Sequence, residues 1–262
     1  MRLTHERRIV EKSHINSPLR SGIILGVREL SKPNLAYRLG LLWIFLDPFL
    51  TAAVYGFLIT VIRGNVDGWS VLIGVITLRA MNGSISKGVS SLMSSEPFPL
   101  IHTPTKPLII SRITSDGIQS FILGLTCAII TLLIVDSPIS LLFHLCLVCV
   151  ILSVLGLGIG LLISPLTTVV KDVARIVKYI LMFSFFLQAV IYEYSATTGT
   201  HKLILSFLPH TICVEWIRSV VAGTQYPFEF QHSLEVMAFW SLISIFGFSK
   251  VDNTRWKASS WS

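Results

Sequence analysis

Residues 138–164 read PISLLFHLCLVCVILSVLGLGIGLLIS and contain no charged side chain. A helix needs about 20 apolar residues to cross a bilayer, so this segment predicts a membrane span. The composition of the whole chain is also that of a membrane protein: of 262 residues, 52% are hydrophobic and 13% are charged, and mean hydropathy is +0.72. Soluble domains carry about 25% charged residues. The composition therefore predicts an integral membrane protein.

Five other segments have the length and composition of spans, and together with 138–164 they predict an all-α protein with six transmembrane helices. Residues 193–228 contain only short apolar stretches, which favour re-entrant or interfacial helices before the last span. The predicted organisation is a tail at 1–38, one transmembrane domain at 39–250 and a second tail at 251–262. The other five predicted spans are 39–62, 71–93, 118–135, 177–192 and 234–248.

The N-terminal tail contains an amphipathic segment at 17–30. Its apolar residues fall on one helical face, whereas Arg20, Arg28 and Glu29 lie largely off that face. It is too short and too charged to span, so we expect it to lie in the membrane interface, where it could also be a simple anchor.

Basic residues cluster beside the apolar runs, and the net charge is +7. The first 38 residues alone hold eight of the 21 lysines and arginines. The positive-inside bias then places both termini in the cytoplasm, and the basic residues are expected to contact lipid headgroups rather than nucleic acid.

The glycines at 156, 158 and 160 resemble part of a dinucleotide fingerprint, but they lie in mid-span, where small residues favour close helix packing. The four cysteines show no metal-ligand or redox spacing, and the chain has no HExxH, GxSxG or Walker A motif. We expect no catalytic residue, no metal and no bound cofactor. Asp47 is the one candidate for an intramembrane ion-coupling acid, although a helix kink at Asp47-Pro48 explains it equally well. Energy for transport would then come from another subunit.

Several motifs occur in an order that resembles a known family. Gly40, Trp43 and Pro48 match an R-x-L-G-x-L-W-x-x-x-x-P pattern at the start of the first span, and Arg38 precedes them one residue nearer to the glycine than in the pattern. Residues 85–87 and 97–107 resemble the second cytoplasmic segment, 170–176 the third, and 208–218 an N-P-x-x-x-x-x-E-x-x-R stretch. Together they resemble the membrane subunit of type-2 ABC exporters of polysaccharides, and most closely capsular permeases of the KpsM type. O-antigen and teichoic acid permeases are close alternatives.

The resemblance implies a multi-pass permease in the cytoplasmic (inner) membrane that moves a lipid-linked polysaccharide. It implies a homodimer with two ABC ATPase subunits, which would bind ATP and Mg, and it allows a periplasmic export adaptor. An intramembrane enzyme and a scaffold for glycan or lipid assembly are the alternatives from other classes. The re-entrant segment 198–223 is expected to act as an external gate.

Candidate site residues fall into three groups, each with an alternative. The proline-rich loop 95–112, expected to be stiff and non-helical, and the third cytoplasmic segment would contact the ATPase; an ordinary loop is the alternative. Aromatic side chains and arginines would line the substrate pathway, although aromatic belts and buried structural pairs are common. Basic residues near the first span would meet the carrier phosphate or ordinary headgroups. The coupling residues are Glu96, Pro97, Phe98, His102, Lys106, Lys171 and Asp172; the pathway residues are Trp43, Tyr55, Phe57, Arg79, Tyr192, Trp216 and Arg218; the entrance residues are Arg28, Lys32 and Arg38.

Overall fold

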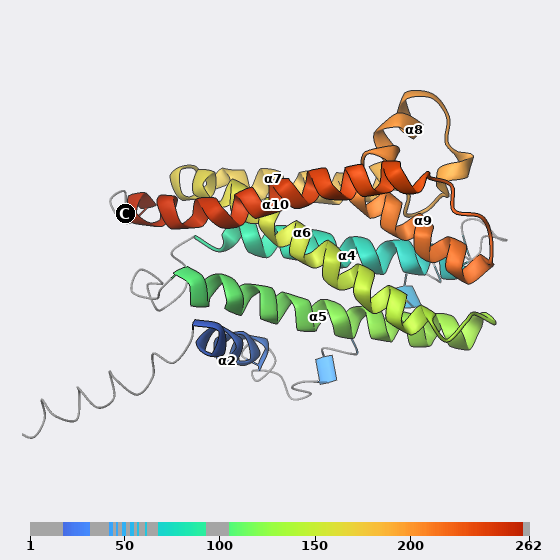
Figure 1. The fold of residues 1–262 in the computed structure, drawn as a ribbon, viewed down its shortest axis with the longest axis horizontal. Helices are drawn as coiled ribbons and strands as arrows, with labels where there is room; N and C mark the ends of the chain where they lie inside the picture. Colours follow the sequence, from blue (N-terminus) through green and yellow to red (C-terminus); the bar gives the residue numbers. More distant parts are fainter. Residues whose placement is uncertain are drawn as a thin grey trace, which may run out of the picture.

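The computed structural model describes residues 18–31, 68–92 and 105–258, together with single positions between 42 and 61. The described segments are helical, and the long helices run alternately up and down one bundle (Figure 1). Helix α2 and the C-terminal end of α10 lie at one end of the bundle, here called the α2 end. The opposite end, here called the α8 end, carries α8, α9 and the start of α4. The helices are α2 (Pro18–Ser31), α4 (Gly68–Ser90), α5 (Thr105–Ile134), α6 (Leu141–Val169), α7 (Asp172–Leu187), α8 (Gly199–Ser206), α9 (Pro209–Ala222) and α10 (Phe230–Ala258).

Helices α4 and α6 form the centre of the bundle and pack closely through small residues. A Cβ added to Gly156 would lie 2.5 Å from the carbonyl oxygen of Met81. Gly160 faces Gly88 of α4 in the same way, and Gly158 faces Ser244 of α10. Close helix packing at the three α6 glycines, predicted from the sequence, is therefore confirmed, and α6 contacts α4 and α10 through backbone-to-backbone approaches.

Helix α6 continues through Pro165 because nearby hydroxyls satisfy the backbone. Proline has no N–H to donate to the carbonyl of Leu161, and the Ser164 hydroxyl donates to that oxygen instead (2.8 Å). One turn on, the Thr167 hydroxyl donates to the carbonyl of Val89 on α4 (3.0 Å). In lipid every backbone group needs a protein partner, and the Ser164 bond supplies one for the carbonyl that Pro165 leaves free, whereas the Thr167 bond joins α6 to the end of α4.

Three of the described helices are long and apolar enough to cross a membrane: 107–134, 141–169 and 230–251. A fourth span is possible if α8 and α9, which are bent by 89°, act as one broken span rather than as a re-entrant loop. Helices α4 and α7 occupy the places of two further predicted spans. The predicted span 39–62, including Asp47 and Pro48, lies largely outside the described residues.

Three boundaries differ from the sequence predictions. Residues 105–112, expected in a non-helical loop, form the first turns of α5, since Pro107 lies in a first turn whose N–H groups lack helical partners anyway. Residues 188–192, predicted to continue the fifth span, leave the helix and turn back. Helix α10 continues to Ala258, into the predicted C-terminal tail, because nothing in that sequence breaks a helix at the membrane surface.

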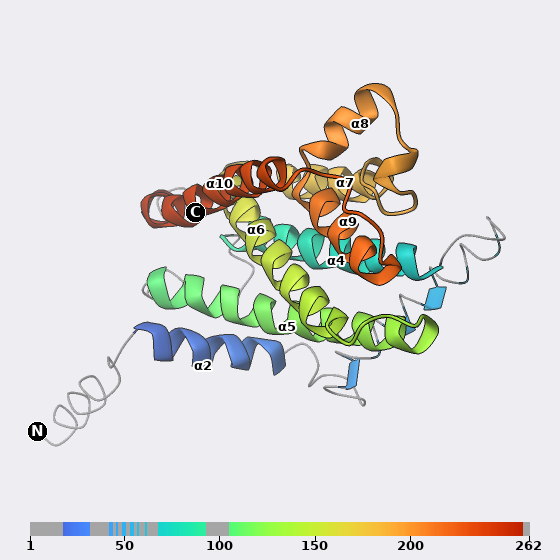
Figure 2. The same cartoon turned by 45° about the vertical axis from the view of Figure 1, so that its right-hand side comes forward.

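Helix α2 is present where the amphipathic segment was predicted, and it runs alongside the first half of α5 (Figures 1 and 2). Its apolar side chains Leu19, Ile24 and Val27 are exposed. On α7 no residue is buried, and Tyr179, Phe183 and other large apolar side chains face outward. Such surfaces suit lipid or another membrane subunit.

Candidate functional site

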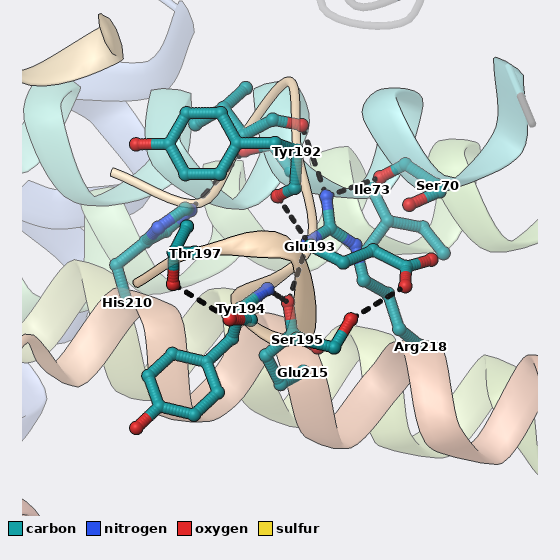
Figure 3. A network of polar contacts seen from close by, with 12 residues as sticks. Ser70, Ile73, Tyr192, Glu193, Tyr194, Ser195, Thr197, His210, Glu215 and Arg218 are labelled. Atoms are coloured by element: carbon teal, nitrogen blue, oxygen red, sulfur yellow. Dashed lines mark hydrogen bonds and ion pairs between the residues drawn. The ribbon is translucent and has the colours of Figure 1, made fainter. Parts of the chain in front are cut away.

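The main polar site of the described chain lies at the α8 end, around the buried Arg218 of α9 (Figure 3). Its Nη1 donates to the carboxylate of Glu215 (2.7 Å) and to the carbonyl of Tyr192 (3.2 Å). Its Nη2 donates to the carbonyls of Val190 (3.0 Å) and Ser70 (3.2 Å). One guanidinium therefore joins α9, the start of α4 and the turn after α7, which explains why that turn leaves the helix.

The Glu215 carboxylate is paired and hydrogen-bonded inside the protein. Its Oε1 accepts the Arg218 bond and a second bond from the backbone N–H of Tyr194 (3.1 Å). Both side chains of the pair are less than a tenth exposed. A buried charge is tolerated only when it is paired and hydrogen-bonded, and this pair meets both conditions.

Gly74 of α4 leaves the space that this network needs. A Cβ at Gly74 would lie 2.9 Å from the carbonyl oxygen of Val190 and 3.3 Å from Nη2 of Arg218. A larger residue would push the turn and the arginine away from α4.

A second contact between α9 and α4 lies beside the first. His210 is fully buried, and its Nε2 lies 3.2 Å from the carbonyl of Gly74 and 3.1 Å from the Thr77 hydroxyl. The Thr77 hydroxyl itself donates to the carbonyl of Ile73 (2.7 Å), so we assign the proton to Nε2, which donates to both oxygens. Arg218 and His210 together fix α9 on the first half of α4.

The contacts of Arg218 and His210 are here called the anchor of α9. Aromatic side chains gather next to this anchor. The ring of Phe228 packs against Tyr194 (centroids 4.3 Å apart), Tyr226 (5.6 Å) and His232 (6.0 Å). Burial raises the pKa of the Tyr226 phenol to about 12, so it stays protonated and donates to the carbonyl of Ile212 (3.3 Å).

Helix α8 is held at both ends by ring nitrogens and hydroxyls. At its start, the Tyr192 hydroxyl contacts Nε2 of His201 (3.0 Å) and donates to the carbonyl of Leu187 (2.9 Å). At its end, Trp240 Nε1 donates to the carbonyl of Phe207 (2.8 Å). A further contact at its end joins Nε2 of His232 to the carbonyl of Ser206 (3.0 Å). The Leu205 side chain of α8 is buried, whereas that of Leu203 is exposed.

Comparison with known protein families supplies the class of the protein. The family model described as ABC-2 type transporter matches residues 24–222. The chain belongs to the ABC-2 type transporter family. No curated protein sequence matches it closely enough to count as a relative. As an ABC-2 permease, the chain is a multi-pass membrane component of an exporter and acts with an ABC ATPase.

The predicted pathway residues of this ABC-2 permease take different positions. Tyr192 and Arg218 belong to the anchor, and the Arg218 guanidinium donates to four protein oxygens, those of Glu215, Tyr192, Val190 and Ser70. Trp216 is partly buried on α9, with its ring 5.1 Å from that of His144. Arg79 is partly buried on α4. Tyr55 lies outside the described residues, while Phe57 is exposed and Trp43 partly buried.

The predicted coupling and entrance residues are only partly described. Lys171 and Asp172 are exposed at the junction of α6 and α7, where Asp172 lies 4.0 Å from Arg175. Lys106 lies in the first turn of α5, and Arg28 is exposed on α2. Outside the described residues lie Glu96, Pro97, Phe98, His102, Lys32 and Arg38.

The sequence reasoning placed Arg218 in the pathway group but missed its structural partners. Glu215 and Arg218 are three residues apart, so an ion pair on one helix face could have been expected. The carbonyls of Ser70 and Val190 carry no side-chain signal, so those contacts could not. Among the described residues no group of three or more metal-ligating side chains comes together, and all four cysteines are buried and unpaired.

Proposed function

We propose that this ABC-2 permease moves a lipid-linked polysaccharide of the capsular type out across the cytoplasmic membrane. It would act as a homodimer with two ATPase subunits that bind ATP and Mg. The observation that carries the glycan part of the proposal is the concentration of aromatic side chains at the α8 end, next to the buried anchor of α9.

Aromatic rings suit a moving sugar chain because they bind flat apolar sugar faces without fixing the chain in one place. Within this region Trp216, Tyr194, Tyr226, Phe228 and Trp240 lie on or beside α9 and α10. An interfacial belt would give a similar composition. The ordered motifs from Arg38 to Arg218 support the polysaccharide reading over the belt alone.

The α8–α9 pair is proposed as the external gate. Helices of 8 and 14 residues are each too short to cross a bilayer, and they meet at 89°. Helix α9 is fixed to α4 by the buried Arg218 and His210, whereas the polar contacts of α8 are those with Tyr192, His232 and Trp240 at its two ends. We therefore expect α8 to move and α9 to stay when the gate opens.

The α2 end is proposed as the entrance for the carrier lipid. Arg28 is exposed on α2 near apolar side chains that would enter the interface, an arrangement that suits a lipid phosphate beside acyl chains. The exposed apolar stripe of α7, with Ile176, Tyr179, Ile180 and Phe183 at helical spacing, is available for lipid or for the second copy.

The test is to purify the permease with its ATPase, reconstitute the complex in vesicles and add candidate lipid-linked glycans. The proposal expects one class of glycan to stimulate ATP hydrolysis severalfold, and the same glycan to accumulate inside cells that lack the permease. Stimulation by a phospholipid or a drug-like amphiphile, with no response to any glycan, would contradict it. Stimulation by an O-antigen or teichoic acid carrier would replace the capsular substrate by one of those polymers.

A scaffold or an intramembrane enzyme of glycan assembly is the second candidate from another class. If the chain were a scaffold or an enzyme, the vesicle assay would show no ATP-driven movement of glycan. The family match to a transporter component favours export over both.

A further inference from the structure

At the α2 end, helix α2 packs tightly along α5 through two glycines. A Cβ on Gly22 would lie 2.6 Å from Cβ of Ile110, and one on Gly26 would lie 2.7 Å from the carbonyl oxygen of Ser111. The glycines are four residues apart and therefore lie on one face of α2. The backbones of α2 and α5 are thus in direct contact over one helical turn.

An ion pair continues this contact. The carboxylate of Glu29 on α2 lies 3.7 Å from Nη1 of Arg112 on α5 and accepts a hydrogen bond from the Ser111 hydroxyl (3.3 Å). Both members of the ion pair are mostly buried. Glu29 therefore adds a charged contact that fixes α2 against α5 lengthwise, beside the close approach at the two glycines.

A second ion pair joins α5 to α4 one turn further along. Lys87 Nζ on α4 lies 2.7 Å from Oδ1 of Asp116 and also donates to the Gln119 side chain. The Asp116 side chain is 1% exposed and that of Lys87 is 40% exposed. Arg112, Asp116 and Gln119 are spaced to lie along one side of α5.

We propose that Glu29, Arg112, Asp116 and Lys87 form a charge ladder, alternating negative and positive, that holds α2, α5 and α4 in one register. The segment between α4 and α5, which is proposed to contact the ATPase, lies largely outside the described residues. Lys87 is near the end of α4 and Asp116 is in the early part of α5, so their pair joins the two helices on either side of that segment. A push on the segment would then move α2, α4 and α5 as one unit.

Charge adds to the register that helix packing gives. The hydrophobic effect itself is non-directional, whereas an ion pair depends on the positions of two particular side chains. A buried ion pair loses its partner when the helices shift, which leaves a charge in a low-dielectric environment. Defining register is the best-supported use of buried charged or polar residues.

The test compares four versions of the reconstituted permease–ATPase complex. They are wild type, the single variant Lys87→Met, the apolar pair K87M/D116L and the exchanged pair K87D/D116K. Glu235→Gln on α10 removes an exposed carboxylate away from the ladder and serves as the matched control. Yield of folded complex, ATP hydrolysis and glycan exported per ATP are measured for each.

We expect Lys87→Met to lower folded yield about tenfold, because it leaves Asp116 buried and unpaired. The apolar pair should recover yield and ATP hydrolysis, yet export at least about fivefold less glycan per ATP, whereas the exchanged pair should return to within about twofold of wild type. Recovery of export per ATP by the apolar pair would overturn the ladder and leave only a structural pair.

The proposal rests on the exporter function, so a second readout does not use the substrate. Spin labels are placed at the exposed positions Ile24 of α2, Ser86 of α4 and Phe121 of α5; the four native cysteines are buried. Narrow distances in wild type and in the exchanged pair, with broad ones in K87M/D116L and Glu29→Gln, support the ladder. Equally narrow distances in all variants reject it. A wild-type complex that moves no glycan but passes this test would reject only the proposed substrate.

Discussion

The two ends of the bundle keep buried charge in different ways. At the α8 end, Arg218 binds one carboxylate and three backbone carbonyls, so most of its partners belong to the main chain. At the α2 end, Lys87 binds Asp116 and Gln119, both through their side chains. Main-chain partners cannot be exchanged by mutation, whereas side-chain partners can. The α8 end therefore holds α9 in one position, and the α2 end allows its pairing to be altered and tested.

The largest difference in stability between the two ends is expected for variants of Arg218. Arg218→Met leaves the Glu215 carboxylate buried without its charge partner, at a cost of about 3–5 kcal/mol of folding free energy. The apolar double variant R218M/E215L should stay destabilised, because the carbonyls of Ser70, Val190 and Tyr192 still lack donors. K87M/D116L at the other end should recover. Thermal unfolding of the purified complexes in detergent measures both pairs of variants, and full recovery by R218M/E215L would contradict the anchor.

A smaller effect is expected where α4 passes the anchor. Gly74→Ala places a methyl group against the Val190 carbonyl and should cost about 1–3 kcal/mol. Gly83→Ala on the same helix meets nothing within 4 Å and should be neutral or stabilise by up to about 1 kcal/mol. Equal unfolding temperatures for the two variants would show that α4 does not pack against the turn as described.

A still smaller change in stability is expected when the Tyr192 hydroxyl, which contacts α8, is removed. Tyr192→Phe removes the contacts to His201 and Leu187 but keeps the ring, so unfolding should become easier by about 1 kcal/mol. If α8 is the moving part of the gate, basal ATP hydrolysis should rise while stability falls little. Tyr179→Phe on the exposed face of α7 is the control, and an identical ATPase change in both variants would argue against a role of Tyr192 in gating.

At the exposed junction of α6 and α7 the change in stability should be smallest. Asp172→Asn breaks a pair that is largely in solvent, and such pairs contribute little. We expect an unchanged unfolding temperature but weaker stimulation of the ATPase by substrate, because Asp172 is proposed to contact the ATPase. Normal stimulation, measured beside a Glu235→Gln control, would remove Asp172 from the coupling surface.

The sequence predicted the features that depend on composition. Residues 138–164 carry no charged side chain, and their glycines could be assigned to helix packing without knowing the partner helices. The prediction that residues 105–112 are non-helical was wrong, because α5 begins at Thr105. The density of prolines in that region was given more weight than the tolerance of a first helical turn for proline. The position of the helix end at Leu187 was missed because the turn that follows it is held by contacts of its Val190 and Tyr192 carbonyls with Arg218, which lies far along the chain.

In the candidate site, too, the sequence indicates local features but not contacts between distant residues. The spacing of Glu215 and Arg218 indicates a pair on one helix face, but nothing in the sequence indicates the carbonyls of Ser70 and Val190. Asp116 was not singled out because it lies in a segment assigned to the cytoplasmic side, so its pairing with Lys87 could not be predicted. Contacts between distant helices depend on packing that composition does not specify.

The most direct test of the central claim is ATP hydrolysis by the reconstituted permease–ATPase complex in response to lipid-linked glycans. The account predicts severalfold stimulation by one class of lipid-linked polysaccharide, accompanied by its movement into the vesicles. The proposal would be contradicted if no glycan changed the rate of ATP hydrolysis while a different class of substrate stimulated it.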